Sequence, residues 1–521
     1  MKKQLRYYVN QKEVVRDVSY IPVRFILAIV LALLATLAVM AIVVLLSIYV
    51  PYFYLLMWAT EIACVIRIAS SDDNPDYKVP WLLVVLVIPV AGLMLYLMFH
   101  SRKLKKKYIR RMHRLKRMAH TRDDAEDLAA LRAADERAGN QVAMLCRIAE
   151  THLYRHTAQT WFPLGEDMFA RMLEDLRRAE RFIFMEYFII EEGRFWNSLL
   201  EVLQEKAAHG VEVKVVYDDI GCMNTLPGDY WRRLGKMGIE ATPFALLRGN
   251  ADSEFNNRSH RKILVIDGQI GYTGGVNIAD EYINEVARFG HWKDVGVRLE
   301  GAAVMELTRL FLLDYGLNVR REPPVKQEYF PPCPAQETPG WVIPFGDGPA
   351  PVYRHQVGKS VIMNMLNQAR RYMYIMTPYL IIDNELSRAI ENAAMRGVDV
   401  RIIVPHIPDK KLIFLMTRSC YARLMAAGVQ MYEYEPGFIH AKCYLADDET
   451  AMVGTINLDY RSLVHHFENG VWMYRTNSIA DIRRDFADTF ARSIRVEERM
   501  IKRGLLQRLT CTLVKIFAPM L

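Results

Sequence analysis

The chain has 521 residues, 52% of them apolar, and a formal net charge of +8. This length excludes a single domain of ordinary size and predicts two or three. The seven cysteines are scattered singly, without the spacing of a metal or redox site, so we expect neither disulfides nor zinc. The positive charge invites a nucleic-acid interpretation, but much of it directly follows an apolar region, where Lys and Arg meet anionic lipid headgroups. We therefore expect no nucleic-acid partner.

The apolar residues are concentrated in the first hundred positions. Val23 to Val50 and Val79 to Phe99 are almost unbroken hydrocarbon, and each exceeds the roughly 20 residues that span a bilayer. Pro51 to Ala69, between them, is apolar apart from two charges. The first run is too long for a signal-peptide core and lacks a small-residue cleavage site. Residues 1–100 are therefore expected to form a multi-pass region of two or three transmembrane helices in the cell membrane.

A dense basic cluster follows this region. Seven Lys and Arg residues lie between Arg102 and Arg111, whereas the loop from Ser70 to Lys78 carries three aspartates. The positive-inside rule therefore places everything after His100 in the cytoplasm. The N-terminus is basic too, which three spans do not allow, so the number of spans stays open. Residues 101–140 are expected to form a juxtamembrane segment and a linking helix, rich in Ala, Leu and charged residues.

Strands and helices alternate from about Trp161 onward. The pattern predicts a strand at Arg181 to Ile190, a helix at Phe195 to His209, and a strand at Val211 to Tyr217. This βαβ alternation is typical of a sheet with helices on its faces, an α/β fold.

The same passage recurs later in the chain. The run from Phe184 to Ile190 is echoed by Ile375 to Ile382, and His209 to Lys214 is echoed by Arg396 to Arg401. The sequence therefore predicts an internal duplication, with a first half at residues 141–321 and a second half at residues 352–498.

Two segments lie outside the halves. Residues 322–351 hold nine prolines, which predicts an extended connector. Residues 499–521 place Leu506, Leu509 and Leu513 on one helical face with basic residues at its edges. This amphipathic helix is expected either to pack on the folded body or to lie on the membrane surface.

One motif occurs once in each half with identical spacing. It reads H-x-K, four residues, D, six residues, G-[GT]-x-N. The first copy comprises His260, Lys262, Asp267, Gly274, Gly275 and Asn277, and the second comprises His440, Lys442, Asp447, Gly454, Thr455 and Asn457. The apolar residues between His and Asp predict a buried strand. Because side chains alternate along a strand, the His and Lys of each copy share a face.

This set of side chains suits the cleavage of a phosphodiester. One imidazole can attack phosphorus and form a covalent intermediate while the other protonates the departing alkoxide. Lys262 and Lys442, with the amides of Asn277 and Asn457, would hold the phosphate oxygens. No step requires a metal or another cofactor. Asp267 and Asp447 are candidate catalytic residues, but a hydrogen-bonding role at a turn explains their position equally well.

The paired motif resembles the phospholipase D superfamily, in which two such copies share one active site. The resemblance implies a duplicated phospholipase D-like fold of two βα-sandwich halves, preceded by the transmembrane region. It also implies that Asp294 and Glu468, which follow the motifs in matching local sequence, orient the two histidines. It further suggests that His260 attacks and that His440 is the acid.

Within the superfamily the chain is most similar to bacterial cardiolipin synthases, from about Pro51 to the C-terminus. Tyr217-Asp218-Asp219 and the residues around both histidines carry this likeness, whereas Val23 to Val50 resembles an added span. The resemblance implies phosphatidyl transfer between two phosphatidylglycerols, releasing glycerol, with phosphatidylglycerol and other anionic phospholipids as partners. A hydrolytic phospholipase D, forming phosphatidic acid, has the same motifs and remains the alternative. The oligomeric state stays open.

Overall fold

The computed structural model describes residues 2–9, 12–19, 52–71, 75–88, 90–99, 106–118, 123–244, 257–319 and 325–501, with scattered positions between 30 and 50 and Val514. The chain forms two compact units. The smaller comprises residues 1–103, 247–257 and 504–521, and the larger comprises residues 104–246 and 258–503. Most of Val23 to Val50, and nearly all of the expected C-terminal helix, lie outside the described residues.

The elements of the smaller unit whose bounds the structure describes are an antiparallel hairpin and three helices. The elements are β1 (Lys2–Val9), β2 (Lys12–Ser19), α2 (Phe53–Ala69), α3 (Pro75–Val87) and α4 (Ala91–Phe99). The expected span from Val79 to Phe99 is not one helix, because α3 ends at Val87 and α4 begins at Ala91. Among the described residues, no helix combines the length and apolar character needed to cross a membrane.

The first half of the larger unit is built on a seven-stranded mixed sheet. Across the sheet the strands are β3 (Ala158–Phe162), β10 (Gly296–Glu300), β8 (Ile270–Gly274), β7 (Ile263–Ile266), β4 (Phe182–Tyr187), β5 (Glu212–Asp218) and β6 (Glu240–Phe244). The predicted strand–helix–strand passage is confirmed as β4, α9 (Arg194–Ala208) and β5, because β4 and β5 pair in parallel.

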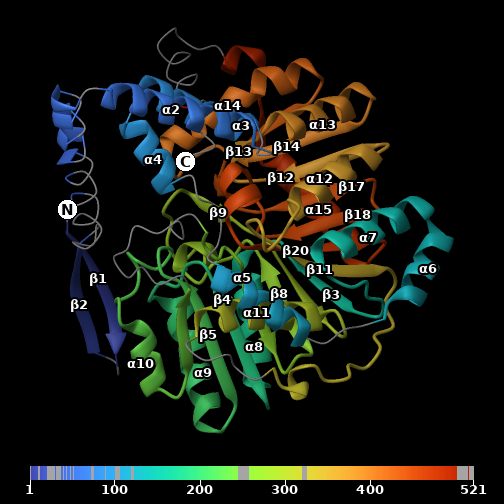
Figure 1. Cartoon of the computed structure of the whole chain (residues 1–521). Coiled ribbons are helices and arrows are strands. Elements are labelled where there is room, and N and C mark those ends of the chain that lie inside the picture. The colour runs from blue at the N-terminus through green and yellow to red at the C-terminus, as the bar shows by residue number, and fades with distance from the viewer. Residues whose placement is uncertain are drawn as a thin grey trace. The chain divides into compact units, whose positions relative to one another are not determined.

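The second half repeats this sheet with one extra edge strand. Its order is β11 (Trp341–Asp347), β20 (Glu468–Tyr474), β18 (Thr450–Gly454), β17 (Cys443–Ala446), β12 (Tyr372–Met376), β14 (Asp399–Pro405), β15 (Gln430–Tyr434) and β21 (Ser493–Arg495). Strand for strand, the first seven correspond to the first sheet. The predicted duplication is confirmed, and in Figure 1 the first half, green to yellow, lies below the second, orange to red.

Two expectations about the segments between elements need correction. Strand β11 lies inside the residues expected to be an unstructured connector. Its Pro344 is tolerated because β11 is an edge strand, where a missing N–H breaks no inner ladder. The linking helix expected near Asp123 is two helices, α6 (Ala125–Ala134) and α7 (Glu136–Ala149). Asp135 separates them, because its side chain accepts hydrogen bonds from the first backbone N–H groups of α7.

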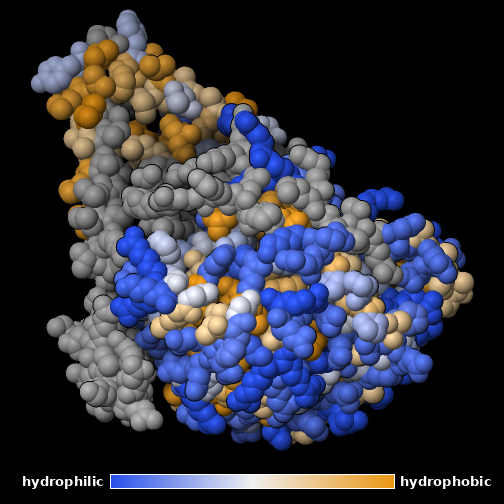
Figure 2. Space-filling model, turned by 90° about the horizontal axis from the view of Figure 1, so that it is seen from below, coloured by the Kyte–Doolittle hydropathy of each residue, from blue (hydrophilic) through white to orange (hydrophobic). Residues whose placement is uncertain are grey.

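Helices cover the outer faces, and one helix is buried between the halves. The covering helices are α5 (Lys106–Met118), α8 (Gly165–Arg177), α10 (Tyr230–Lys236), α12 (Val357–Gln368), α13 (Asn384–Met395), α14 (Lys411–Ala426) and α15 (Ser478–Ala491). The buried helix, α11 (Val304–Asn318), contacts strands of both sheets. Its Phe311 stacks on Phe184 of β4 with ring centroids 4.7 Å apart. Seen from below, the larger unit is mostly hydrophilic, with scattered apolar residues (Figure 2).

Candidate active site

Each motif histidine is held by the backbone of the opposite half. The N–H of His260 donates to the carbonyl of Phe467 at 2.8 Å, and the N–H of His440 donates to the carbonyl of Lys293 at 2.7 Å. The second contact extends a short parallel ladder between β9 (His291–Lys293) and β16 (Gly437–Ile439). Phe467 and Lys293 each immediately precede an acidic residue. The backbone therefore brings each histidine beside the carboxylate of the other half.

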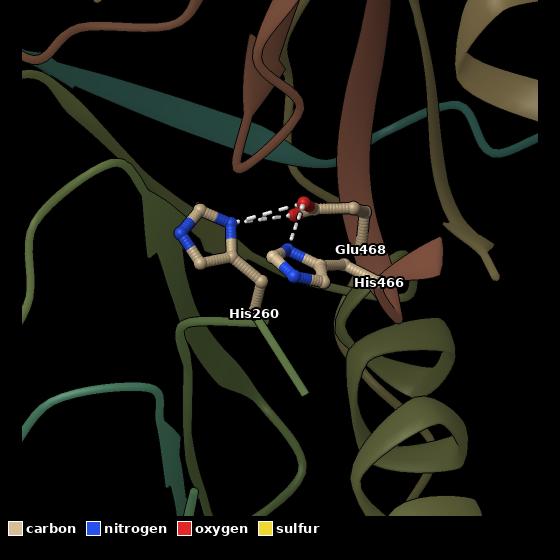
Figure 3. Close-up of side chains that lie close together, drawn as sticks. All are labelled: His260, His466 and Glu468. Carbon is tan, nitrogen blue, oxygen red and sulfur yellow. Dashed lines mark hydrogen bonds and ion pairs between the residues drawn. The ribbon is translucent and has the colours of Figure 1, made fainter. Parts of the chain in front are cut away.

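The resulting pairs cross between the halves. Nδ1 of His260 lies 3.0 Å from both carboxylate oxygens of Glu468, and Nδ1 of His440 lies 2.6 Å from Oδ2 of Asp294. All four side chains are buried. A carboxylate that accepts from Nδ1–H keeps the lone pair of a neutral imidazole on Nε2, which is the form that a nucleophile requires. Figure 3 shows the His260 ring directed at Glu468.

Glu468 has more hydrogen-bond partners than Asp294. Thr455 Oγ1 donates to it at 2.5 Å and Ser462 Oγ at 2.6 Å, and Nδ1 of His466 lies 3.7 Å away. Burial alone would raise the pKa of Glu468, but His260 and His466 outweigh it and hold that pKa well below its usual range. Sequence reasoning missed Ser462 and His466. The signal for both was a polar side chain within six residues of an orienting carboxylate.

Asp294 has fewer partners. Its carboxylate accepts from its neighbour's N–H, that of Val295, at 2.8 Å, in addition to contacting His440. Burial raises the pKa of Asp294 to about 7, although Lys442 opposes this. A Cβ atom at Gly275 would lie 2.0 Å from Oδ1 of Asp294, so only glycine fits there. The second motif has Thr455 at this position, which donates to Glu468 instead.

Burial also lowers the pKa values of the basic groups of the site. It lowers the pKa of His260 to about 3, and burial together with Lys442 lowers that of His440 well below its usual range. Burial lowers the pKa of Lys262 to about 7 and that of Lys442 to about 8. Part of the shift in Lys262 comes from the charge of Lys442, which shows that the two motifs converge.

The two motif asparagines are not equivalent. Nδ2 of Asn277 donates to the hydroxyl of Tyr282 at 2.7 Å, and its Oδ1 accepts from the N–H of Ile189 at 3.1 Å. Its amide is thus engaged by the protein. Oδ1 of Asn457 is buried without a hydrogen-bond partner among the described residues. The expected symmetry of phosphate contacts therefore does not extend to these side chains.

The motif aspartates lie at the far ends of their strands. The carboxylate of Asp267 accepts from the N–H groups of residues 180–182 at 2.8 to 2.9 Å, and that of Asp447 from residues 370–372 at 2.8 to 3.0 Å. The four-residue strand before each aspartate spans about 13 Å. These contacts favour the structural alternative over direct catalysis, because the carboxylates cannot reach the imidazoles.

One set of side chains has the composition of a metal site. The donor atoms of His260, His466 and Glu468 lie within 4.8 Å of one another (Figure 3). A cation bound there would replace the proton on Nδ1 of His260 and move the remaining N–H to Nε2. Nε2 of His260 would then carry the hydrogen and would have no free lone pair to act as a nucleophile.

Two family models match the chain. One, described as cardiolipin synthase, phospholipase D-like domain, matches residues 172–288 and 362–490, and the other, described as phospholipase D-nuclease N-terminal, matches residues 62–99. A phosphatidylserine synthase from Haemophilus influenzae has a similar structure, with a TM-score of 0.56 at 15% identity over 73% of this chain and 98% of its own. This likeness supports the fold.

Curated relatives align over most of the chain. An uncharacterized protein of Streptococcus mutans is 41% identical over 88% of this chain and all of its own length. Cardiolipin synthases of Halalkalibacterium halodurans and Geobacillus kaustophilus are 31% and 32% identical, each over 90% of this chain and 94% of its own. The chain therefore belongs to the cardiolipin synthase family of phospholipase D-like phosphatidyltransferases.

Proposed function

We propose that this protein is a cardiolipin synthase, which moves a phosphatidyl group from one phosphatidylglycerol to another and releases glycerol. The observation that carries the proposal is the crossed pairing of His260 with Glu468 and of His440 with Asp294. Two oriented imidazoles beside two buried ammonium groups suit double displacement at a phosphodiester. The family of the chain and the names of its relatives support the substrate class.

A difference between the two pairs supports the roles that we propose for them. Glu468, with its low pKa, stays ionised and accepts Nδ1–H of His260, so the Nε2 lone pair of His260 attacks phosphorus. Asp294, with a pKa of about 7, can carry a proton at neutral pH. A protonated Asp294 donates to Nδ1 of His440 and leaves a proton on Nε2 for the departing glycerol oxygen. His260 is thus the nucleophile and His440 the acid.

The two steps balance without another group. In the first, the bond from His260 Nε2 to phosphorus forms as the phosphorus–glycerol bond breaks and glycerol takes the proton from His440. In the second, His440 accepts a proton from a hydroxyl of the second phosphatidylglycerol, whose oxygen displaces His260. Lys262 and Lys442 neutralise the non-bridging oxygens in both steps, and the Nδ2 amide group of Asn457 is a further proposed donor to them.

The walls of the site favour a lipid acceptor over water. Phe188 packs against the ring of His260 with centroids 5.0 Å apart, and Tyr282, Trp292 and Phe438 pack around His440 at 5.4 to 6.0 Å. Aromatic walls exclude bulk water, which would otherwise hydrolyse the covalent intermediate. This observation ranks transfer above hydrolysis to phosphatidic acid.

The proposal includes anchoring of the enzyme in the cell membrane through residues 1–100, with the catalytic unit in the cytoplasm. The support is sequence alone: the apolar runs, and the basic cluster after His100. A lipid substrate makes such an anchor useful, because it keeps the enzyme at the surface where both substrates reside.

Product analysis tests the proposal. Detergent-purified full-length protein is given phosphatidylglycerol, and lipids and glycerol are quantified by mass spectrometry. Cardiolipin and glycerol in equal amounts are expected. Phosphatidic acid without cardiolipin would reassign the protein as a hydrolase, and His260→Ala serves as the inactive control.

A further inference from the structure

Two loops near His440 expose apolar and basic side chains together. The first precedes β9 and contains Val286 and Arg288. The second joins β14 to α14 and contains Ile407 and Lys410, and the first turn of α14 adds Lys411 and Leu412. These six residues are called the rim. Val286 is 51% exposed, Leu412 44% and Ile407 38%, in a unit whose apolar side chains are otherwise largely buried. Contact with another apolar surface would remove these side chains from water, which is favourable.

The two loops are neighbours, although more than a hundred residues separate them. A Cβ atom at Gly290 would lie 3.3 Å from Cδ1 of Ile407. The N–H of His291, the first residue of β9, donates to the carbonyl of Pro436, which immediately precedes β16. The rim therefore consists of one loop from each half, joined at the strand pair that holds His440.

Aromatic rings connect the rim to His440. Phe289 packs against Trp292 and Phe438 with centroids 6.3 and 6.1 Å apart, and both of these rings contact His440. On the other side, Tyr379 lies 6.5 Å from Phe438, and Nζ of Lys410 lies 5.7 Å above the Tyr379 ring. Lys410 is close enough for its charge to lower the pKa of His440, an effect smaller than that of burial.

The acidic groups near the rim are already engaged. Asp409 accepts from the hydroxyl of Tyr379 at 2.6 Å and lies 3.9 Å from Lys410, and Glu281 lies 3.3 Å from Arg288. Glu285 pairs with Arg194. Of the three cations of the rim, Arg288 and Lys410 thus lie beside carboxylates, and Lys411 has no ion pair among the described residues, so the rim keeps a net positive charge beside its apolar side chains. This combination complements an anionic bilayer surface, where basic groups meet headgroups and apolar side chains enter the acyl boundary.

We propose that the rim is the surface through which the catalytic unit contacts an anionic phospholipid bilayer and receives lipid headgroups at His440. The inference rests on the proposed function, because a diacyl substrate cannot leave the bilayer without exposing every buried methylene to water. The mouth of the site must therefore touch the membrane. Once the rim is seated, a headgroup reaches His440 along the aromatic side chains while its acyl chains stay in the bilayer.

The test compares two forms of one substrate with the full-length protein. The first is long-chain phosphatidylglycerol in vesicles with phosphatidylcholine, and the second is dihexanoyl phosphatidylglycerol below its micellar concentration. The variant Val286→Asp/Leu412→Asp should lose tenfold or more of its activity on vesicles and less than twofold on the soluble lipid. The matched control is Met395→Asp, because Met395 is 62% exposed at the end of α13, opposite the rim along β14. It should change neither activity.

A charge variant tests the proposed contact with the bilayer independently. Lys411→Glu should lower vesicle activity at low ionic strength, and the loss should fade as salt screens the surface. Unchanged vesicle activity in both variants would overturn the proposal, as would an equal loss on both substrates. The proposed function is tested separately, by identifying the product that the unaltered enzyme forms. Phosphatidic acid from the soluble lipid would contradict cardiolipin synthesis. The ratio of vesicle activity to soluble activity in the variants would still show whether the rim contacts the bilayer.

Discussion

Nδ1 of His260 lies 3.0 Å from both carboxylate oxygens of Glu468, although 208 residues separate the two in the chain. The mirror pair joins His440 to Asp294 at 2.6 Å. Each half therefore supplies a histidine and the carboxylate that orients the histidine of the other half. Neither half contains a complete His–carboxylate pair, so the proposed catalysis requires both halves.

The crossed pairing predicts which histidine each carboxylate variant impairs. With a nitrophenyl phosphatidyl ester, Glu468→Gln should abolish the nitrophenol burst, because a neutral amide no longer holds His260 in its nucleophilic form. The expected loss of kcat is about 10³–10⁴-fold, by analogy with the neutralised aspartate of a serine protease triad. Asp294→Asn should keep the burst. Rapid-mixing absorbance measures both, and a burst lost only in Asp294→Asn would reverse the assignment.

Variants of the two histidines should behave differently in the same assay. Nitrophenolate departs without protonation, so His440→Ala should release one equivalent of nitrophenol and leave a slowly turning-over phosphatidyl group on the protein. On phosphatidylglycerol, whose glycerol is a poor leaving group, the same variant should lose about 10²–10⁴-fold. His260→Ala should show neither burst nor adduct by intact-protein mass spectrometry. Adducts in both variants would mean that either imidazole can attack.

The protonation state of the Asp294–His440 pair should make the activity on phosphatidylglycerol depend on pH. Because the pKa of Asp294 is raised to about 7, the carboxyl is protonated below this pH and ionised above it. The kcat/KM for phosphatidylglycerol divided by that for the nitrophenyl ester should fall as pH rises through about 7. Taking the ratio cancels the loss of charge on Lys262 and Lys442, which affects both substrates. A ratio constant between pH 6 and 8.5 would refute the role of Asp294, and Asp294→Asn should flatten the profile.

The motif aspartates should matter for stability rather than turnover. Asp267→Asn removes an ionised acceptor from the N–H groups of residues 180–182 and should lower the free energy of unfolding by about 1–3 kcal/mol. Its kcat should stay within twofold of the unaltered enzyme. Asp447→Asn is the matched variant in the second half. Thermal melting followed by tryptophan fluorescence gives the stability, and an unchanged melt with a hundredfold loss of kcat would restore a catalytic role.

Turnover should survive chelation by EDTA, because side chains fill every step of the proposed mechanism. The assay belongs in neutral detergent micelles, since divalent ions also alter anionic lipid surfaces. Loss of activity that magnesium or manganese restores would point to a catalytic cation. His466→Asn would then show whether His260, His466 and Glu468 hold it.

The sequence alone determined the local structure and the types of residue available. The apolar runs after each H-x-K formed β7 and β17, and the repeated passages formed two sheets of the same strand order, because side-chain alternation and burial act over a few residues.

The tertiary structure alone decided how the site is assembled. Nothing local to His260 distinguishes Asp294 from Glu468 as its partner. The choice is made by the backbone contacts of His260 with Phe467 and of His440 with Lys293, which form only when the two sheets associate. Pairing with β20, which is distant in the sequence, made β11 an edge strand of the second sheet despite its proline. Long-range pairing depends on the packing of whole sheets, and that free energy is not encoded in any single segment.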